Sequence, residues 1–429
     1  MSLAPPVWRP TQALLRAGVA SAVAALAAVV LGRPDLLVLA APLLLHASVA
    51  AVRRPAGRPT ARMRLEHPAI REGEATRAHV VVEDVAGGET FVLAQSRPQW
   101  TVTDPASGVA TADLTGADRG GVVLGVGSQR WGRRRVGGGS FAVTSAWAGY
   151  RWGPSTLPDA WLTTLPLPGS FDSRAPAPHP LGVVGRHPAR RPGEGTELHS
   201  VRPFAAGDRL RRVRWPVSLR TGTLHVTSTV AEQDSSVLLL VDNGVQVGTS
   251  GGIGGASTSL DTAVRAAGAV AEHTLRRGDR VALRVLASSR PAPVPPGTGN
   301  RHLRRVLDTL AAVTPGRTDS PVPASWQVPA GAVVLVFTPM LSDLALAATS
   351  TLARRGLSVV VVDTLPDDVP LDDERSRLAW RLRLVERRGL LLRLTRAGIP
   401  VVPWSGPGTL DEVLRRLARR SSMPRLVRR

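Results

Sequence analysis

Several short strings in this 429-residue sequence look like sites of chemistry, but their contexts do not fit. Ser250 lies in a G-x-S-x-G match at 248–252, yet that nucleophile pattern needs a strand-to-helix turn and this serine stands inside a Gly- and Ser-rich loop. The overlapping glycine-rich stretch 251–257 is too far beyond the preceding apolar run to form a tight phosphate-binding turn. His199 and His225 have no recognisable nucleophile and acid set around them. We therefore expect no catalytic residues and no enzyme activity.

Two residue types are missing altogether, which removes further classes of chemistry. The sequence contains no lysine, so no P-loop is present. It also contains no cysteine, which excludes disulfides, thiolate catalysis and cysteine-ligated zinc.

A different set of polar residues follows the apolar runs of the C-terminal half. After residue 234, continuous apolar strands alternate with helical patterns, which predicts a doubly wound, mostly parallel sheet over 229–429. The expected strands are 236–241, 280–287, one from 332, 357–365 and 399–402, and the expected helices are 260–277, 301–313, 342–355, 372–397 and 410–419. Ligands of such sheets bind at the carboxyl ends of the strands, where Asp242, residues 338–343 and Asp363 would lie.

The first 55 residues predict a transmembrane helical hairpin. Apolar runs at 13–31 and 36–52 are separated by a four-residue turn, and neither run has the polar stripe of a soluble amphipathic helix. A buried soluble hairpin and a cleaved signal peptide are the alternatives, but a signal peptide leaves the second run unexplained. Arginines flank the hairpin and largely spare its turn, so both tails and the whole soluble part are expected on the cytoplasmic side of the plasma membrane. These arginines are Arg9, Arg16, Arg53, Arg54, Arg58, Arg62 and Arg64, against Arg33 in the turn.

Between the hairpin and the α/β region, the hydrophobic pattern of the sequence is typical of β-strands. Short alternating runs broken by Gly, Pro and Asp predict a small antiparallel β-sandwich at 60–166. The Pro-, Gly- and Arg-rich stretch that follows predicts a linker at 167–194.

The most unusual string is GTELHSVRPFAAGDRLRRVRWPVSLRTGTLHVTS, residues 195–228. It closely resembles the signature of the "domain of unknown function 58" family, with mild departures at Phe204, Val213 and Leu219. The matching residues are Gly195, Glu197, Arg202, Gly207, Asp208, Arg211, Trp215, Ser218, Arg220, Gly222 and Leu224. We expect a signature cluster beside the α/β domain, formed by Glu197, Arg202, Gly207, Asp208, Arg211, Trp215, Ser218 and Arg220.

The resemblance carries expectations of its own. Members of this family are similar to von Willebrand factor A domains and often occur beside MoxR-type AAA+ ATPases. A von Willebrand fold would place a metal site at the strand ends, with Asp242, Thr298 and Asp343 as its remnants here. The D-x-S-x-S loop that holds the ion reads Asp-Asn-Gly-Val-Gln from Asp242, so both serines are lost. No cofactor is therefore expected, and Mg²⁺ is the one candidate ion, at a degenerate site.

The net charge of the protein indicates which kinds of molecule it could bind. A net charge of +21 and a pI of about 11.7 favour anionic partners, of which lipid headgroups beside a membrane explain the charge most simply. The sequence shows no nucleic-acid-binding motif. We expect a membrane-anchored, non-enzymatic protein-binding scaffold or adaptor that works with a MoxR-type ATPase. The alternatives are a polyanion- or nucleic-acid-binding membrane protein and, less favoured, a metal-dependent hydrolase using Asp242 and Asp343.

Overall fold

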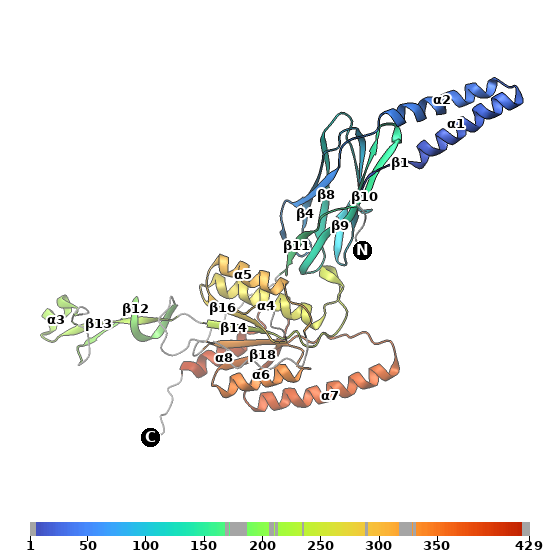
Figure 1. The fold of residues 1–429 in the computed structure, drawn as a ribbon. Coiled ribbons are helices and arrows are strands. Elements are labelled where there is room, and N and C mark those ends of the chain that lie inside the picture. Colours follow the sequence, from blue (N-terminus) through green and yellow to red (C-terminus); the bar gives the residue numbers. More distant parts are fainter. Residues whose placement is uncertain are drawn as a thin grey trace. The chain divides into compact units, whose positions relative to one another are not determined.

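The computed structural model describes residues 6–167, 171, 187–205, 210, 213–233, 236–287, 291–316, 328 and 332–422, with only the backbone described for 187–200, 228–233 and 417–422. The chain forms two compact units, Met1–Leu165 and Pro166–Arg429. Each unit is described by itself below (Figure 1).

Two long apolar helices open the first unit. Helix α1 spans Gln12–Leu31 and begins at the N-cap Thr11, whose side chain accepts from Leu14 N. A left-handed Gly32 (φ 62°) ends α1, and α2 follows at Asp35–Val52. Both helices are long and apolar enough to cross a membrane. An 18-residue stretch of each has a mean hydropathy of 2.2 and 2.0, and only 17% and 11% of the residues in these stretches are buried. So little burial is not the pattern of helices in a soluble core.

The hairpin is joined to the β-structure of the same unit. Strand β1 (Trp8–Pro10) pairs antiparallel with β10 (Tyr150–Thr156), so that Trp8 stands opposite Trp152. The N–H of Thr11 donates to Gly149 O at 2.9 Å, directly before α1 begins. The expected boundary between residues 55 and 60 therefore does not separate two compact units, because the residues before α1 supply a strand to the sheet.

Two sheets enclose one hydrophobic core in the remainder of this unit, as the alternating sequence pattern predicts. A four-stranded sheet has the order β2-β4-β8-β6, and a seven-stranded sheet contains β1, β10, β9, β11, β3, β5 and β7. Phe91, Leu93, Leu124, Phe141 and Leu162 lie in the core between them. The remaining strands are β2 (Thr60–Leu65), β3 (Ala69–Arg71), β4 (Ala75–Glu83), β5 (Gly88–Ser96), β6 (Thr101–Asp104), β7 (Val109–Asp113), β8 (Arg119–Ser128), β9 (Gly132–Ser145) and β11 (Ala160–Leu165).

The second unit begins with a two-stranded ribbon that carries the signature. Strands β12 (His187–Pro203) and β13 (His225–Gln233) pair antiparallel, and the short helix α3 (Trp215–Thr221) lies in the connection between them. We call β12, α3 and β13 the signature arm. The expected linker at 167–194 is wrong over 187–194, because these residues pair with β13; most of its earlier part lies outside the described residues.

The α/β domain follows directly, with a six-stranded sheet in the order β16-β15-β14-β17-β18-β19. Every neighbouring pair is parallel except β15 and β16. Helices α4 and α5 cover one face of the sheet, and α6 and α7 cover the other (Figure 1). The elements are β14 (Ser236–Val241), α4 (Ser259–Arg276), β15 (Arg280–Val285), β16 (Val294–Gly297), α5 (Asn300–Ala311), β17 (Val333–Thr338), α6 (Asp343–Arg354), β18 (Ser358–Asp363), α7 (Glu374–Arg396), β19 (Val401–Pro403) and α8 (Asp411–Ser422).

This series confirms the predicted mostly parallel α/β sheet, since every expected strand and helix is present within a few residues. Strand β16 is the exception, because the Val-Pro-Pro-Gly run of 294–297 has neither an apolar run nor alternation. Its prolines are tolerated at this position because β16 is an edge strand.

Candidate functional site

Asp242 directly follows the central strand β14 and lies in a buried hydrogen-bond network. Asp242 is 1% exposed. Its carboxylate accepts from Thr338 Oγ1 at 2.7 Å, from Ser342 Oγ at 3.3 Å and from the N–H of Gly244 at 3.0 Å. Thr338 ends β17 and Ser342 is the N-cap of α6, so the network joins two neighbouring strands and a helix.

Burial dominates the electrostatics of this carboxyl group. Removal from water raises the pKa of Asp242 above its ordinary value of 3.8, more than the hydrogen bonds from Thr338, Gly244 and Ser342 lower it. The three donors hold the Asp242 side chain in place, so the geometry gives it a structural role.

The hydroxyls around Asp242 have second partners inside the protein. Thr338 Oγ1 accepts from the N–H of Met340 at 2.8 Å, and Met340 adopts a left-handed backbone (φ 53°). Ser342 Oγ accepts from Ala345 N at 3.0 Å and so caps α6. These hydroxyls therefore fix the β17–α6 loop, and the geometry gives them structural roles.

The residue after Asp242 also holds neighbouring loops. Asn243 Nδ2 donates to Thr314 O at 2.7 Å, and Asn243 Oδ1 accepts from Ala287 N at 2.9 Å. This position therefore ties β14 to the segments that follow β15 and α5.

A second carboxylate, Asp363, ends β18 at the same edge of the sheet. It forms an ion pair with Arg387 of α7, and the two side chains are 19% and 10% exposed. Arg387 Nε also donates to Pro339 O at 2.6 Å, and Arg383 donates to Leu341 O at 3.0 Å. Two arginines thus clamp α7 to the loop beside Asp242.

The expected metal-site residues do not converge. Thr298 follows β16, and the antiparallel register of β15 and β16 places Gly297 opposite Val281, at the amino end of the parallel strands. Asp242 lies at the carboxyl ends of the parallel strands, whereas Thr298 lies at their amino ends. Asp343 is exposed in the first turn of α6, where a carboxylate is favourable beside the helix N-terminus.

The donor set that remains does not fit a tight Mg²⁺ site. A hard cation needs about six oxygen ligands, whereas both oxygens of Asp242 already accept from protein donors. Across the described residues, no group of three or more His, Asp or Glu side chains could hold a metal ion. The von Willebrand expectation for Asp242, Thr298 and Asp343 is thus not supported by the geometry.

Part of the signature arm is explained by its own internal bonding. Ser218 is buried; its Oγ donates to Arg214 O at 2.9 Å and accepts from the N–H of His225 at 2.9 Å. Gly222 has a left-handed backbone (φ 69°) and ends α3. The ring Nδ1 of His225 lies 3.1 Å from Thr221 Oγ1, which gives this histidine a structural role.

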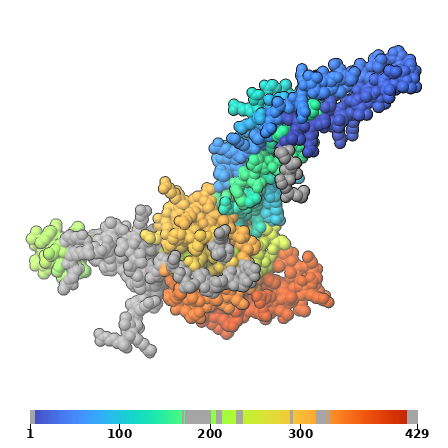
Figure 2. Space-filling model, viewed as in Figure 1, coloured from blue at the N-terminus to red at the C-terminus, as the bar shows by residue number. Residues whose placement is uncertain are grey.

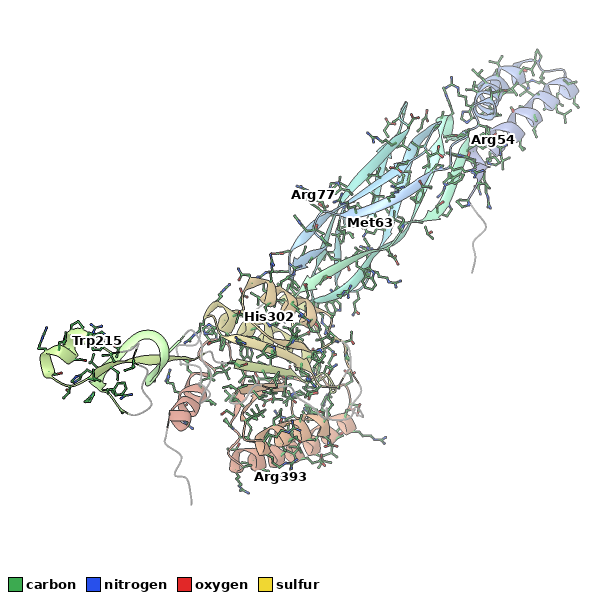
Figure 3. All side chains as sticks on the ribbon, turned by 60° about the vertical axis from the view of Figure 1, so that its left-hand side comes forward. Arg54, Met63, Arg77, Trp215, His302 and Arg393 are labelled. Carbon is green, nitrogen blue, oxygen red and sulfur yellow. The ribbon has the colours of Figure 1, made fainter. Side chains whose placement is uncertain are left out.

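Other residues of the signature arm lie at its surface. Trp215, labelled in Figure 3, is 59% exposed, and Leu219, one helical turn later, is 81% exposed. Arg202 and Arg220 are also exposed, and Arg202 Nη1 donates to Pro203 O at 3.1 Å. Of the expected signature cluster, Arg202, Trp215 and Arg220 thus lie at the surface of the arm. Only the backbone of Glu197 is described, and Gly207, Asp208 and Arg211 lie outside the described residues.

Comparison with known proteins finds a match over the region that contains the Asp242 network and part of the signature arm. Residues 200–386 match the family model "Protein of unknown function DUF58". Uncharacterized proteins of Mycobacterium bovis and of two strains of Mycobacterium tuberculosis are each 29% identical to the chain over 190 residues, 43% of this chain and 52% of theirs. The chain thus spans about half the length of the curated relatives it matches.

The matched region, residues 200–386, includes α3, the Asp242 network and the first half of α7. Sequence reasoning found Asp242, the 338–343 stretch and Asp363 from the ends of apolar strands. It missed Arg383 and Arg387, whose signal is their spacing with Leu384, Leu391 and Leu394 on one face of α7.

Proposed function

We propose that this DUF58 protein is a membrane-anchored, non-enzymatic scaffold that binds a protein partner through its signature arm. The observation that carries the proposal is the exposure of Trp215 and Leu219 side by side on α3. They are four residues apart on one helix, so their side chains lie on one face. Large aromatic side chains at the surface are typical anchors of protein interfaces.

The interior of the arm supports the same function. Ser218 and Gly222 shape α3 and its return to β13. Contact residues that are held in place before the partner arrives lower the entropic cost of binding. The signature thus combines residues that build the arm with residues that the arm presents.

The carboxyl edge of the sheet supports a binding role over catalysis. Asp242 is enclosed by hydroxyl and backbone donors, and the described residues offer no nucleophile and base assembled around it. Its central strand position is compatible with a von Willebrand factor A-like domain in which the metal site has become a structural brace. A hydrolase using Asp242 and Asp343 is disfavoured, because Asp343 faces solvent on α6.

Localisation and partner class complete the proposal. Helices α1 and α2 would anchor the chain in the plasma membrane, and the arginines that flank them favour a cytoplasmic soluble part. A MoxR-type AAA+ ATPase is the proposed partner, on the strength of the family resemblance.

Co-purification from native membranes tests the proposal. Tagged full-length protein is compared with Trp215→Ala and Leu219→Ala, and Trp161→Ala is the matched control because Trp161 is also exposed, at 48%, on β11. We expect one partner, an AAA+ ATPase, to be retained by the control and reduced on the order of tenfold or more by either arm variant. Equal partner yield from all four proteins would refute a role for the arm.

A further inference from the structure

Helix α7 carries an apolar stripe that the α/β domain does not cover. Leu378, Leu382, Val385 and Leu392 are 59%, 61%, 67% and 52% exposed. With Gly389 they are spaced by four, three, four and three residues, so they lie within about 80° of one another around the helix. The stripe runs for roughly 21 Å along α7, at 1.5 Å per residue.

The opposite face of α7 packs against the core of the α/β domain. Leu391 and Leu394 pack against the core formed with β14, β17 and α6. Arg383 and Arg387 donate to the β17–α6 loop on the same side. The helix therefore has two apolar faces, and burial in this domain accounts for only one of them. The segment that contains α7 forms part of the visible surface in Figure 2.

The charges beside the stripe indicate what would cover it. Residues 374–396 contain eight Arg and two Glu, a net charge of +6. One of the two glutamates, Glu386, is paired with Arg383 at 3.1 Å. Exposed arginines border the stripe along its length, and Arg393 is labelled in Figure 3. They are Arg375, Arg381, Arg388, Arg393 and Arg396.

We propose that α7 is an interfacial helix that docks on an anionic lipid surface. Its leucines and valine would enter the boundary of headgroups and acyl chains, while the bordering arginines would contact lipid phosphates. A second copy of the chain fits less well, because pairing two such helices would bring their arginine borders together. The inference rests on the membrane anchor of the proposed function, which keeps a bilayer within reach of the chain.

This docking gives the scaffold a second attachment to the membrane besides α1 and α2. Arg387 of α7 contacts Asp363 and the carbonyl oxygen of Pro339. A helix docked on lipid would therefore remain connected to the loop beside Asp242.

The absence of cysteine permits a direct test with the full chain. Leu382→Cys, labelled with the environment-sensitive dye NBD, is reconstituted into vesicles of phosphatidylcholine alone or with phosphatidylglycerol. Ala347→Cys, exposed on α6, is the matched label position. We expect a blue shift and a severalfold protection from acrylamide at position 382 in the anionic vesicles only, with no change at 347.

Charge variants separate lipid binding from a general electrostatic effect. In the labelled protein, Arg381→Gln with Arg388→Gln should weaken docking about fivefold per arginine removed. Arg301→Gln with Arg305→Gln, on exposed positions of α5, removes the same charge and should leave docking unchanged.

Two results would overturn the inference. One is a label at 382 that stays in water in both vesicles while the protein resists extraction by alkaline carbonate, which shows that the anchor holds and α7 does not dock. The other is concentration-dependent self-quenching at 382 in phosphatidylcholine vesicles, which assigns the stripe to a second copy. Extraction of the protein by carbonate would instead contradict the membrane anchor of the proposed function.

Discussion

The hydroxyl of Thr338 donates a 2.7 Å hydrogen bond to the carboxylate of Asp242 and so joins the ends of two neighbouring parallel strands. Ser342 adds a second hydroxyl and carries the contact on to α6. The position where the family resemblance implies a metal site is thus occupied by an internal network, whose properties can be measured.

Removal of the Asp242 side chain should destabilise the α/β domain. In Asp242→Ala, each buried donor left unsatisfied costs about 1–3 kcal/mol of the free energy of unfolding. Chemical denaturation of the full chain in detergent measures the loss. Asp343→Ala is the control, because Asp343 is exposed on α6 and should cost far less. Equal losses in the two variants would contradict the structural role of Asp242.

The raised pKa of Asp242 predicts a pH dependence with a definite sign. Because the folded pKa lies above the ordinary value of 3.8, the stabilisation linked to this group is complete below that value and is lost as the pH rises through the folded pKa. The free energy of unfolding of the wild type, minus that of Asp242→Asn, should therefore decrease as the pH rises across this window. A difference that increases with pH would show that the folded pKa is lowered.

Divalent ions should not bind tightly at the carboxyl edge of the sheet. The oxygens of Asp242 already accept hydrogen bonds, and Thr298 lies at the other edge. Calorimetric titration of the protein with Mg²⁺ and Mn²⁺ measures this. Micromolar binding that disappears in Asp242→Ala would restore these residues to a functional metal site.

The ion pair between Asp363 and Arg387 should hold α7 on the domain. Arg387→Met leaves Asp363 unpaired where both side chains are largely buried, at a cost of about 3–5 kcal/mol. Hydrogen exchange along α7 should accelerate in this variant. The adjacent Arg388→Met is the control, because Arg388 is exposed and its loss should cost at most about 1 kcal/mol. Equal hydrogen exchange in the two variants would contradict the role of the Asp363–Arg387 ion pair in holding α7 on the domain.

The elements of the α/β domain could be predicted because buried parallel strands are continuous apolar runs and their order along the chain is regular. The same pattern placed Asp242 and Asp363 at one edge correctly. It misplaced Thr298, because β16 runs antiparallel and returns the chain to the amino edge before α5 begins. A strand of Val, Pro, Pro and Gly gives no periodic signal of that reversal.

The surface position of Trp215 could not be predicted for a different reason. Hydrophobicity predicts an interior position, but α3 lies on a two-stranded ribbon, and its inward side is taken by Ser218. Which side of a seven-residue helix meets the ribbon depends on pairings between residues distant in sequence, such as Phe204 N to Leu224 O at 2.8 Å.

Site-specific photo-crosslinking from the signature arm tests the central claim most directly. A photoreactive amino acid at Leu219, activated in intact cells, should give one crosslinked product that contains an AAA+ ATPase, and Trp215→Ala should abolish it without changing the thermal unfolding of the protein. The same residue placed at Trp161 should give no such product. Absence of a crosslink from position 219, or an equal crosslink in the Trp215→Ala background, would contradict a partner-binding role for the arm.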